Sequence, residues 1–200
     1  MASIPVIQSQ QEHFEEWQLP DRGKVGMLTL ILGESALFSM FVLAYIFYIG
    51  KSISGPQPAQ VLDIPVFMTI CLWSSSFTIW LAERAIEHGK MKIFAGFWAL
   101  TIALGAIFLG GTALEWKRLI YHDGLTITTN LFGTTFYSLV GLHASHVVVG
   151  LIMLITVLIL TLTGHVKQEH AHRIKTLALY WHFVDAVWVI VFTVVYVLGR

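Results

Sequence analysis

The sequence is short of charge and of cysteine. Only 12% of its 200 residues are charged, and its 12 Lys and Arg balance its 12 Asp and Glu, so the formal net charge is zero. This balance gives no sign of nucleic-acid binding. The single cysteine, Cys71, lies in an apolar run, which excludes a disulfide framework and a paired-cysteine metal site. The sequence also lacks a phosphate-binding loop, a nucleophile–base pair and a redox motif.

The N-terminal residues 1–24 lack the features of a cleaved signal peptide. They are rich in Gln and Glu and have neither a basic start nor a short apolar core. We predict that residues 1–24 form a polar segment that lies at the membrane surface or is partly disordered. Targeting would then depend on the first membrane helix itself.

Apolar residues, by contrast, make up 56% of the chain, and the mean hydropathy is +0.73. This composition is typical of membrane proteins. Apolar runs long enough to cross a bilayer as helices cover residues 25–49, 63–85, 93–116, 130–163 and 175–198. The sequence therefore predicts an all-α membrane protein, a bundle of five transmembrane helices over residues 25–200. No internal repeat supports an inverted-repeat transporter.

The distribution of Lys and Arg predicts the orientation of this bundle. Five spans place the two termini on opposite sides, and cytoplasmic loops carry an excess of Lys and Arg. The side that holds the N-terminal tail and the loops near residues 84–92 and 165–175 carries more of these residues than the other side. We predict a cytoplasmic N-terminus and an outside C-terminus. Gly89 and Gly164 are predicted helix stops, and Asn130 is a predicted N-cap.

Ionisable residues interrupt the apolar runs at the first and last spans. His182 and Asp185, in the segment YWHFVDAVW (180–188), are three residues apart and share one helix face. With a rise of 1.5 Å per residue, this pair lies about 10–15 Å from the cytoplasmic helix end and Glu34 roughly 14 Å. Ionisable groups inside a membrane are costly and are candidates for a functional site. A satisfied polar pair that joins helices is the structural alternative.

Glu34 has two possible arrangements at this depth. A buried carboxylate is desolvated, so it must be protonated or paired. We hypothesise that Glu34 faces the bundle interior and reaches His182 and Asp185, directly or through water. The alternative is a neutral acid bonded to its own helix backbone or to Ser35 or Ser39.

A second polar group is predicted nearer the outer side. His143 and His146 share a face of the fourth span, some 25–30 Å from its cytoplasmic end, and Glu115 lies near the outer end of the third span. Two histidines at this spacing can ligate a metal or haem, but they need a further ligand, for which Glu115 and Tyr137 are the candidates. The alternative is a structural polar cluster of Glu115, His143 and His146.

The loop before the last span combines histidines with basic residues. A chelating site is one interpretation, and contact with anionic lipid headgroups is the one we favour. The residues predicted to contact lipid are His165, Lys167, Arg173 and Lys175.

Tryptophans near the predicted membrane interfaces are predicted to be aromatic-belt anchors; they are Trp17, Trp116 and Trp181. Small residues that allow close helix approach, without evident chemistry, occur at 74–76, Gly105, Gly110 and Gly111.

Motifs in a fixed order resemble subunit III of the haem–copper oxidases, in its five-helix bacterial type. They are LGESALF (32–38), Glu115-Trp116, GTTFY with GLHASHVVVG (133–150) and YWHFVDAVW (180–188). The resemblance covers about residues 25–200. Ala144 stands where the family usually has Gly, and SSSF (74–77) stands where some members have adjacent histidines.

The resemblance implies a non-catalytic subunit of a cytochrome c or quinol oxidase, a proton-translocating terminal oxidase that reduces O2 to water. It implies no redox centre, catalytic residue or metal in this chain, with haem and copper in the partner subunits I and II. It further implies direct contact with subunit I, bound phospholipid, support of the catalytic subunit, and assistance with proton uptake or oxygen access. Glu34, His182 and Asp185 would be the buried, proton-linked residues of a protein in the bacterial inner membrane.

Two other functions remain as alternatives. A haem-binding membrane cytochrome would use His143, His146 or His182, and the isolated chain would show a haem band. A small proton-coupled transporter would use Glu34 as the carrier and would move substrate in liposomes without partners. The electron donor of the parent oxidase is set by other subunits.

Overall fold

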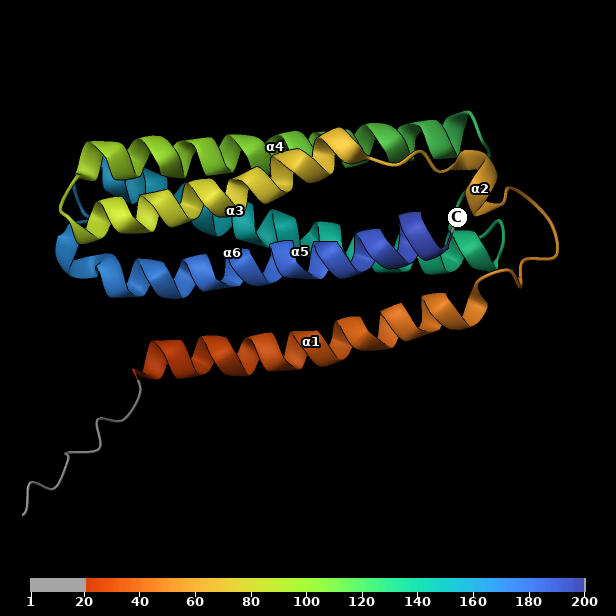
Figure 1. Cartoon of the computed structure of the whole chain (residues 1–200), viewed down its shortest axis with the longest axis horizontal. Helices are drawn as coiled ribbons and strands as arrows, with labels where there is room; N and C mark the ends of the chain where they lie inside the picture. The colour runs from red at the N-terminus through yellow and green to blue at the C-terminus, as the bar shows by residue number, and fades with distance from the viewer. Residues whose placement is uncertain (1–20, 200) are drawn as a thin grey trace, which may run out of the picture.

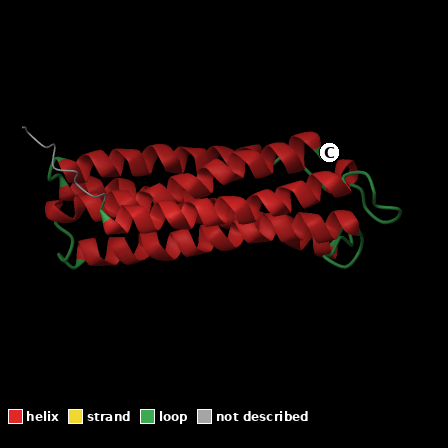
Figure 2. Cartoon of the chain, turned by 90° about the horizontal axis from the view of Figure 1, so that it is seen from below, coloured by secondary structure: helices red, strands yellow, loops and turns green. Residues whose placement is uncertain are grey.

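The computed structural model describes residues 21–199, and within that range the chain is built from helices and loops without a strand. Helices that are long and apolar enough to cross a membrane number five in the described residues, which confirms the predicted fold class. Figures 1 and 2 show them as one bundle of roughly antiparallel rods. The spans are α1 (Arg22–Tyr48), α3 (Val66–Glu87), α4 (Met91–Tyr121), α5 (Leu131–Leu162) and α6 (Ala171–Phe192), which continues as the π-helical η2 (Thr193–Leu198).

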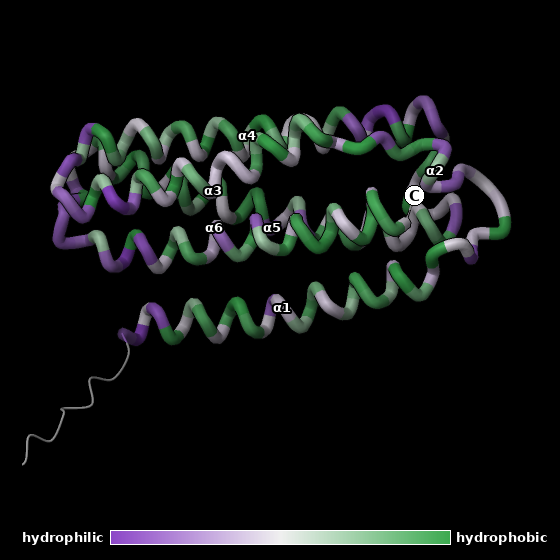
Figure 3. The backbone as a smooth tube through the Cα atoms, in the orientation of Figure 1, coloured by the Kyte–Doolittle hydropathy of each residue, from purple (hydrophilic) through white to green (hydrophobic). Residues whose placement is uncertain are grey.

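Short elements and polar loops connect the spans. The helical turn α2 (Pro58–Val61) lies between α1 and α3, and the 3-10 turn η1 (Gln168–His170) precedes α6. Figure 3 shows that the hydrophilic residues gather at the two ends of the bundle and that the middle is mostly hydrophobic. The start of α1 and the end of η2 lie at opposite ends (Figure 1). This agrees with an odd number of spans; which end faces the cytoplasm stays a prediction.

The residues predicted to begin or to end a helix are confirmed. The side chain of Asn130 accepts a hydrogen bond from Gly133 N at 2.8 Å at the start of α5. Gly89 and Gly164 follow α3 and α5 with φ of +69° and +78°, a left-handed conformation that favours glycine.

Several predicted boundaries were wrong. α1 begins at Arg22, inside the segment predicted to be polar and outside the bundle, and residues 1–20 lie outside the described residues. α3 begins after Pro65 rather than at Asp63, and α2 occupies a stretch predicted as a loop. α4 continues to Tyr121, and α6 begins at Ala171, within the predicted His-rich loop. Amphipathic helix ends that carry polar residues beyond the apolar core explain the longer spans.

α6 with η2 belongs to the most buried of the five spans, and it packs against α1, α3 and α5. Its Trp181 is 1% exposed and lies between glycines of two neighbouring helices. A Cβ on Gly105 of α4 would stand 2.7 Å from the Trp181 ring, and a Cβ on Gly150 of α5 would stand 2.8 Å from it. Trp181 is therefore a buried wedge, and its prediction as a membrane-interface anchor was wrong.

Trp116 and Trp17, the other two predicted membrane-interface anchors, are not wedged between glycines as Trp181 is: one has different surroundings and the other lies outside the described residues. Trp116 is half-buried and packs edge-on against Tyr137, with 5.3 Å between ring centroids. Trp17 lies outside the described residues. The prediction that Gly105 allows close helix approach is confirmed, whereas a Cβ on Gly110 would meet nothing within 4 Å.

We expect Gly105→Ala to destabilise the bundle by about 1–3 kcal/mol, because the added methyl group overpacks the Trp181 site. Gly96→Ala is the matched control on the same helix, where a Cβ meets nothing within 4 Å. Unfolding in mixed micelles, followed by circular dichroism during titration with SDS, measures both. Equal stability of the two variants would contradict the wedge role of Trp181.

Candidate functional site

Hydrogen bonds join α3 to α6 at three successive levels, which we call the α3–α6 ladder. Trp181 Nε1 donates to Ser75 Oγ at 2.9 Å, and Trp188 Nε1 donates to Thr69 Oγ1 at 3.2 Å. Between these two, Ser76 Oγ donates to Asp185 Oδ2. Serine and threonine are short enough to stay in the interface and still offer a partner, so the ladder satisfies polar groups without separating the helices.

Asp185 and His182 meet at Ser76. Asp185 is 4% exposed, and within residues 21–199 its Oδ1 has no hydrogen-bond partner. His182 Nδ1 lies 3.3 Å from Ser76 Oγ, and His182 Nε2 lies 4.0 Å from Glu83 Oε1. His182 and Asp185, which share a helix face as predicted, are therefore linked through a serine of α3.

Glu34 does not join this pair, so the hypothesis of a polar contact between it and His182 or Asp185 was wrong. His146 Nε2 lies 3.0 Å from Glu34 Oε2, and the other ring nitrogen of His146 lies 2.8 Å from Leu142 O. Glu34 and His182 do lie at similar depth, about 16–18 Å into their helices. Glu34 and Asp185 stay apart because they do not lie on facing sides of α1 and α6. Phe183 packs towards Phe38 of α1, and Asp185, about 200° further round the helix, points away from α1.

The Glu34–His146 pair lies where α1 packs against α5. The side chains are 25% and 13% exposed, and Phe38 packs on the imidazole with 4.9 Å between ring centroids. The pair lines an open cavity of about 250 Å³ together with Met27, Ser145, Met153 and Tyr180. An acid and an imidazole therefore hold α1, whose buried residues are Phe38 and Tyr45, to the bundle.

The predicted cluster of Glu115, His143 and His146 does not form. His143 is fully enclosed, stacks on Trp188 at 5.0 Å and meets Phe108 edge-on at 5.9 Å. Neither of its ring nitrogens has a hydrogen-bond partner among the described residues. His143 and His146 project into different surroundings although they share a helix face. In the part of the chain that the structure describes, no three His, Cys, Asp or Glu side chains come together as metal ligands.

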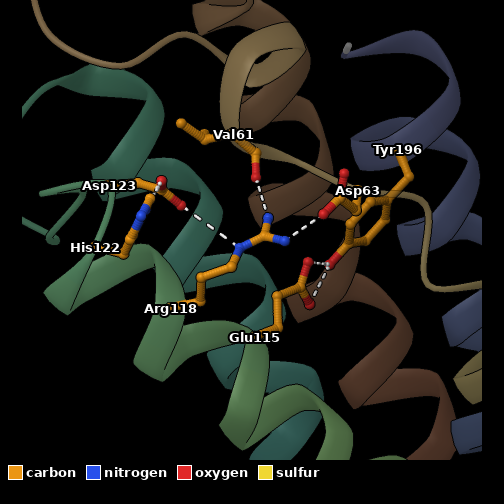
Figure 4. A network of polar contacts seen from close by, with 7 residues as sticks. All are labelled: Val61, Asp63, Glu115, Arg118, His122, Asp123 and Tyr196. Atoms are coloured by element: carbon orange, nitrogen blue, oxygen red, sulfur yellow. Dashed lines mark hydrogen bonds and ion pairs between the residues drawn. The ribbon is translucent and has the colours of Figure 1, made fainter.

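Glu115 instead belongs to a polar network at the η2 end of the bundle (Figure 4). Tyr196 Oη donates to its two carboxylate oxygens at 3.0 and 3.2 Å. One turn along α4, Arg118 pairs with Asp63 and donates to Val61 O at 2.6 Å. Its Nε also lies 3.6 Å from Asp123. This network ties the loop before α3 and the loop after α4 to the C-terminal turns.

The predicted lipid-contacting residues lie at the opposite end. Lys175 forms an ion pair with Glu87 of α3, and Gln168 Nε2 donates to Glu87 O at 2.6 Å. His165 Nδ1 lies 2.9 Å from Thr163 Oγ1. Lys175 therefore has a structural partner. Lipid contact of these residues, with Lys167 and Arg173, stays a prediction.

Sequence reasoning missed the hydroxyl partners of the ladder. Ser75 and Ser76 were treated as small residues without chemistry, and Thr69 was not singled out. The available signal was the helical spacing of Thr69, Ser75 and Ser76, which lie on the inward side of α3. Tyr196 was missed because an aromatic residue in an apolar run gives no sign of a buried acid partner.

Comparison with known proteins gives one consistent result. A model of the family described as cytochrome c oxidase subunit III matches residues 17–200. The chain is 35% identical over 190 residues to cytochrome c oxidase subunit 3 of Alkalihalophilus pseudofirmus, covering 94% of this chain and 92% of that protein. It is 34% identical over 180 residues to cytochrome c oxidase subunit 3 of Bacillus subtilis (88% and 86%). It is 28% identical over 179 residues to the probable quinol oxidase subunit 3 of Staphylococcus saprophyticus (88% and 89%).

We expect Ser76→Ala to destabilise the chain by about 1–3 kcal/mol, because it removes the hydrogen-bond donor to a buried acid. Ser74→Ala is the matched control two residues away, since the Ser74 side chain makes no hydrogen bond within residues 21–199, and its effect should stay within about 0.5 kcal/mol. SDS titration in mixed micelles measures both. A Ser76→Ala variant as stable as Ser74→Ala would show that the ladder does not hold α3 to α6.

A double-mutant cycle tests the contact between α1 and α5. We expect Glu34→Leu and His146→Leu each to destabilise the chain, and the double variant to lose less than the sum of the two. Polar contacts between membrane helices give coupling energies of about 0.6 kcal/mol on average and up to about 1.7 kcal/mol. The same unfolding assay yields the coupling energy. Strictly additive losses would mean that the two side chains do not interact.

Proposed function

Because this chain belongs to the cytochrome c oxidase subunit III family, we propose that it acts as subunit III of a respiratory terminal oxidase whose other subunits reduce O2. The family match over residues 17–200 carries the proposal, and the five-span bundle agrees with it. Haem and copper would be held by partner subunits I and II. The ionisable side chains inside this bundle support a structural role, since Asp185, Glu34 and Glu115 each use a side chain of another helix as partner.

Direct contact with a catalytic subunit is supported by the outward face of α3. Trp73 and Trp80 are exposed on this face, each about 5 Å from the midpoint of α3 along its axis. Tryptophan favours the two membrane interfaces, where its N–H can be hydrated. The exposed Trp73 in the middle of α3 favours a protein neighbour over lipid tails, whereas the Trp80 ring already packs against the Arg84 guanidinium at 4.0 Å. Subunit I would be that neighbour.

Phospholipid binding is supported by a groove between α1 and α6. A cavity of about 530 Å³ runs between these helices and is lined mainly by apolar side chains, among them Phe38, Val42, Phe183 and Ile190. Lys24, His172 and Lys175 line a second cavity nearer the start of the same two helices. An acyl chain fits the apolar groove, and the second cavity, where Glu83 also lines the wall and Lys175 is paired with Glu87, offers a headgroup partners of both charges. The membrane would be the bacterial cytoplasmic membrane, with the N-terminal side inside.

Affinity purification of the tagged chain from its native membrane tests the function. We expect haem-containing partner subunits to co-purify, with reduced-minus-oxidised haem bands and oxygen consumption in the eluate. A copper-binding domain in subunit II would identify cytochrome c as the electron donor, and its absence a quinol.

Two results would contradict the proposal. A haem band from the chain freed of all partners would make it a cytochrome in its own right. Substrate-driven proton flux by the chain alone in liposomes, without any oxidase subunit in the purified material, would make it a transporter. Glu34→Gln is the control in the flux assay, since a carrier acid is required only in the transporter.

A further inference from the structure

A line of polar side chains enters the bundle from the end where α3 stops and α6 starts. It begins with Glu83 Oε1, 4.0 Å from His182 Nε2, continues from His182 Nδ1 to Ser76 Oγ at 3.3 Å, and ends at Asp185. The first gap is long for a direct hydrogen bond and is of a size that one water molecule spans. The remaining steps are direct contacts between groups that both donate and accept protons.

The mouth of this line is an open polar cavity. The cavity has a volume of about 390 Å³ and is lined by side chains from α1, α3 and α6, among them Lys24, Glu83, His172, Lys175 and His182. Glu87, paired with Lys175, stands beside it on α3. The His182 side chain is 35% exposed, whereas Asp185 is 4% exposed. A cavity of this size and polarity holds several water molecules, so water reaches the imidazole but not the acid.

The far end of the line is closed. Trp181 and Trp188, one helical turn to either side of Asp185, are both buried, and their N–H groups are committed to Ser75 and Thr69. Asp185 Oδ1 is enclosed without a hydrogen-bond partner in the described part of the chain. A carboxylate in such a place is poorly solvated, which favours the neutral acid.

We propose that Asp185 is a proton-holding site that exchanges its proton with water at one end of the bundle only, through Ser76 and His182. For loading, His182 Nε2 takes a proton from water in the cavity, His182 Nδ1 gives its proton to Ser76 Oγ, and the Ser76 hydroxyl proton passes to Asp185 Oδ2. At His182 one N–H bond forms and one breaks, and at Ser76 one O–H bond forms and one breaks. The net change is one proton moved from water to the carboxylate. Unloading is the reverse.

This site depends on contacts within the chain, so it holds whether or not the proposed function is correct. The end that carries the cavity is the one that the Lys and Arg distribution assigns to the cytoplasm. The bundle would thus hold a proton near its centre that is in equilibrium with the cytoplasmic side.

Infrared spectroscopy of the purified full-length protein, with whatever subunits it retains, tests the proposal. The protonated carboxyl band of Asp185 is identified as the band lost in Asp185→Asn, and its shift to lower wavenumber after transfer to D2O gives the rate of exchange. We expect complete exchange in the wild type. In Ser76→Ala and in His182→Leu we expect the same band with exchange slowed at least about tenfold, equivalent to a barrier higher by about 1.4 kcal/mol.

Matched variants separate the path from general destabilisation. Ser76→Thr keeps the hydroxyl and should exchange at the wild-type rate, and Ser74→Ala, beside the path, should do the same. Thr69→Ala removes a rung of the ladder on the closed side and should leave the rate unchanged. If Ser76→Ala does not fold, His182→Leu decides the question.

Three outcomes would overturn the proposal. The absence of a protonated carboxyl band that depends on Asp185 would mean that the group is ionised. Wild-type exchange in His182→Leu would mean that protons arrive by another route. Slowing in Ser74→Ala or Thr69→Ala equal to that in Ser76→Ala would mean that exchange follows the stability of the bundle and not this path.

Discussion

A polar group inside this bundle is costly unless it finds a partner within the protein, because hydrocarbon offers none. That constraint is met chiefly on α3 and α6, where Ser75, Ser76 and Thr69 accept or donate for Trp181, Asp185 and Trp188. The ladder fixes the rotation of α6, and α6 in turn presents its other faces to α1 and α5. α4 is held separately, by its packing on α3 and by hydrogen bonds between Thr101 and Thr78 and from Trp98 to Leu154 O.

Close packing and polar pairing act together around α6. Trp181 fills the space left by Gly105 and Gly150, so a large ring sits where three helices would otherwise leave a void. α1 has fewer buried side chains and is joined to α5 through Glu34 and His146. The bundle thus has a tightly packed part, α3 to α6, and a more exposed α1 beside the groove proposed for lipid.

The sequence predicted the features that depend on local chemistry and missed those that depend on helix rotation. Apolar run length, the Asn130 cap and the glycines after α3 and α5 act within a few residues, so the spans and their order were correct. Depth along the axis placed Glu34 level with His182, yet depth does not say which face of α6 meets α1. Asp185 therefore received the wrong partner, and Ser76, which donates to it, was overlooked. The family resemblance was confirmed, while the roles of its ionisable residues stay proposals.

An experimental density map of the chain within its oxidase would test the organising role of the α3–α6 contact most directly. We predict density that places the Asp185 carboxyl against Ser76 and the Glu34 carboxyl against His146. The Trp181 ring should lie between Gly105 and Gly150. A map in which Asp185 turns towards α1 and meets Glu34, with Ser76 facing lipid or a partner subunit, would contradict it.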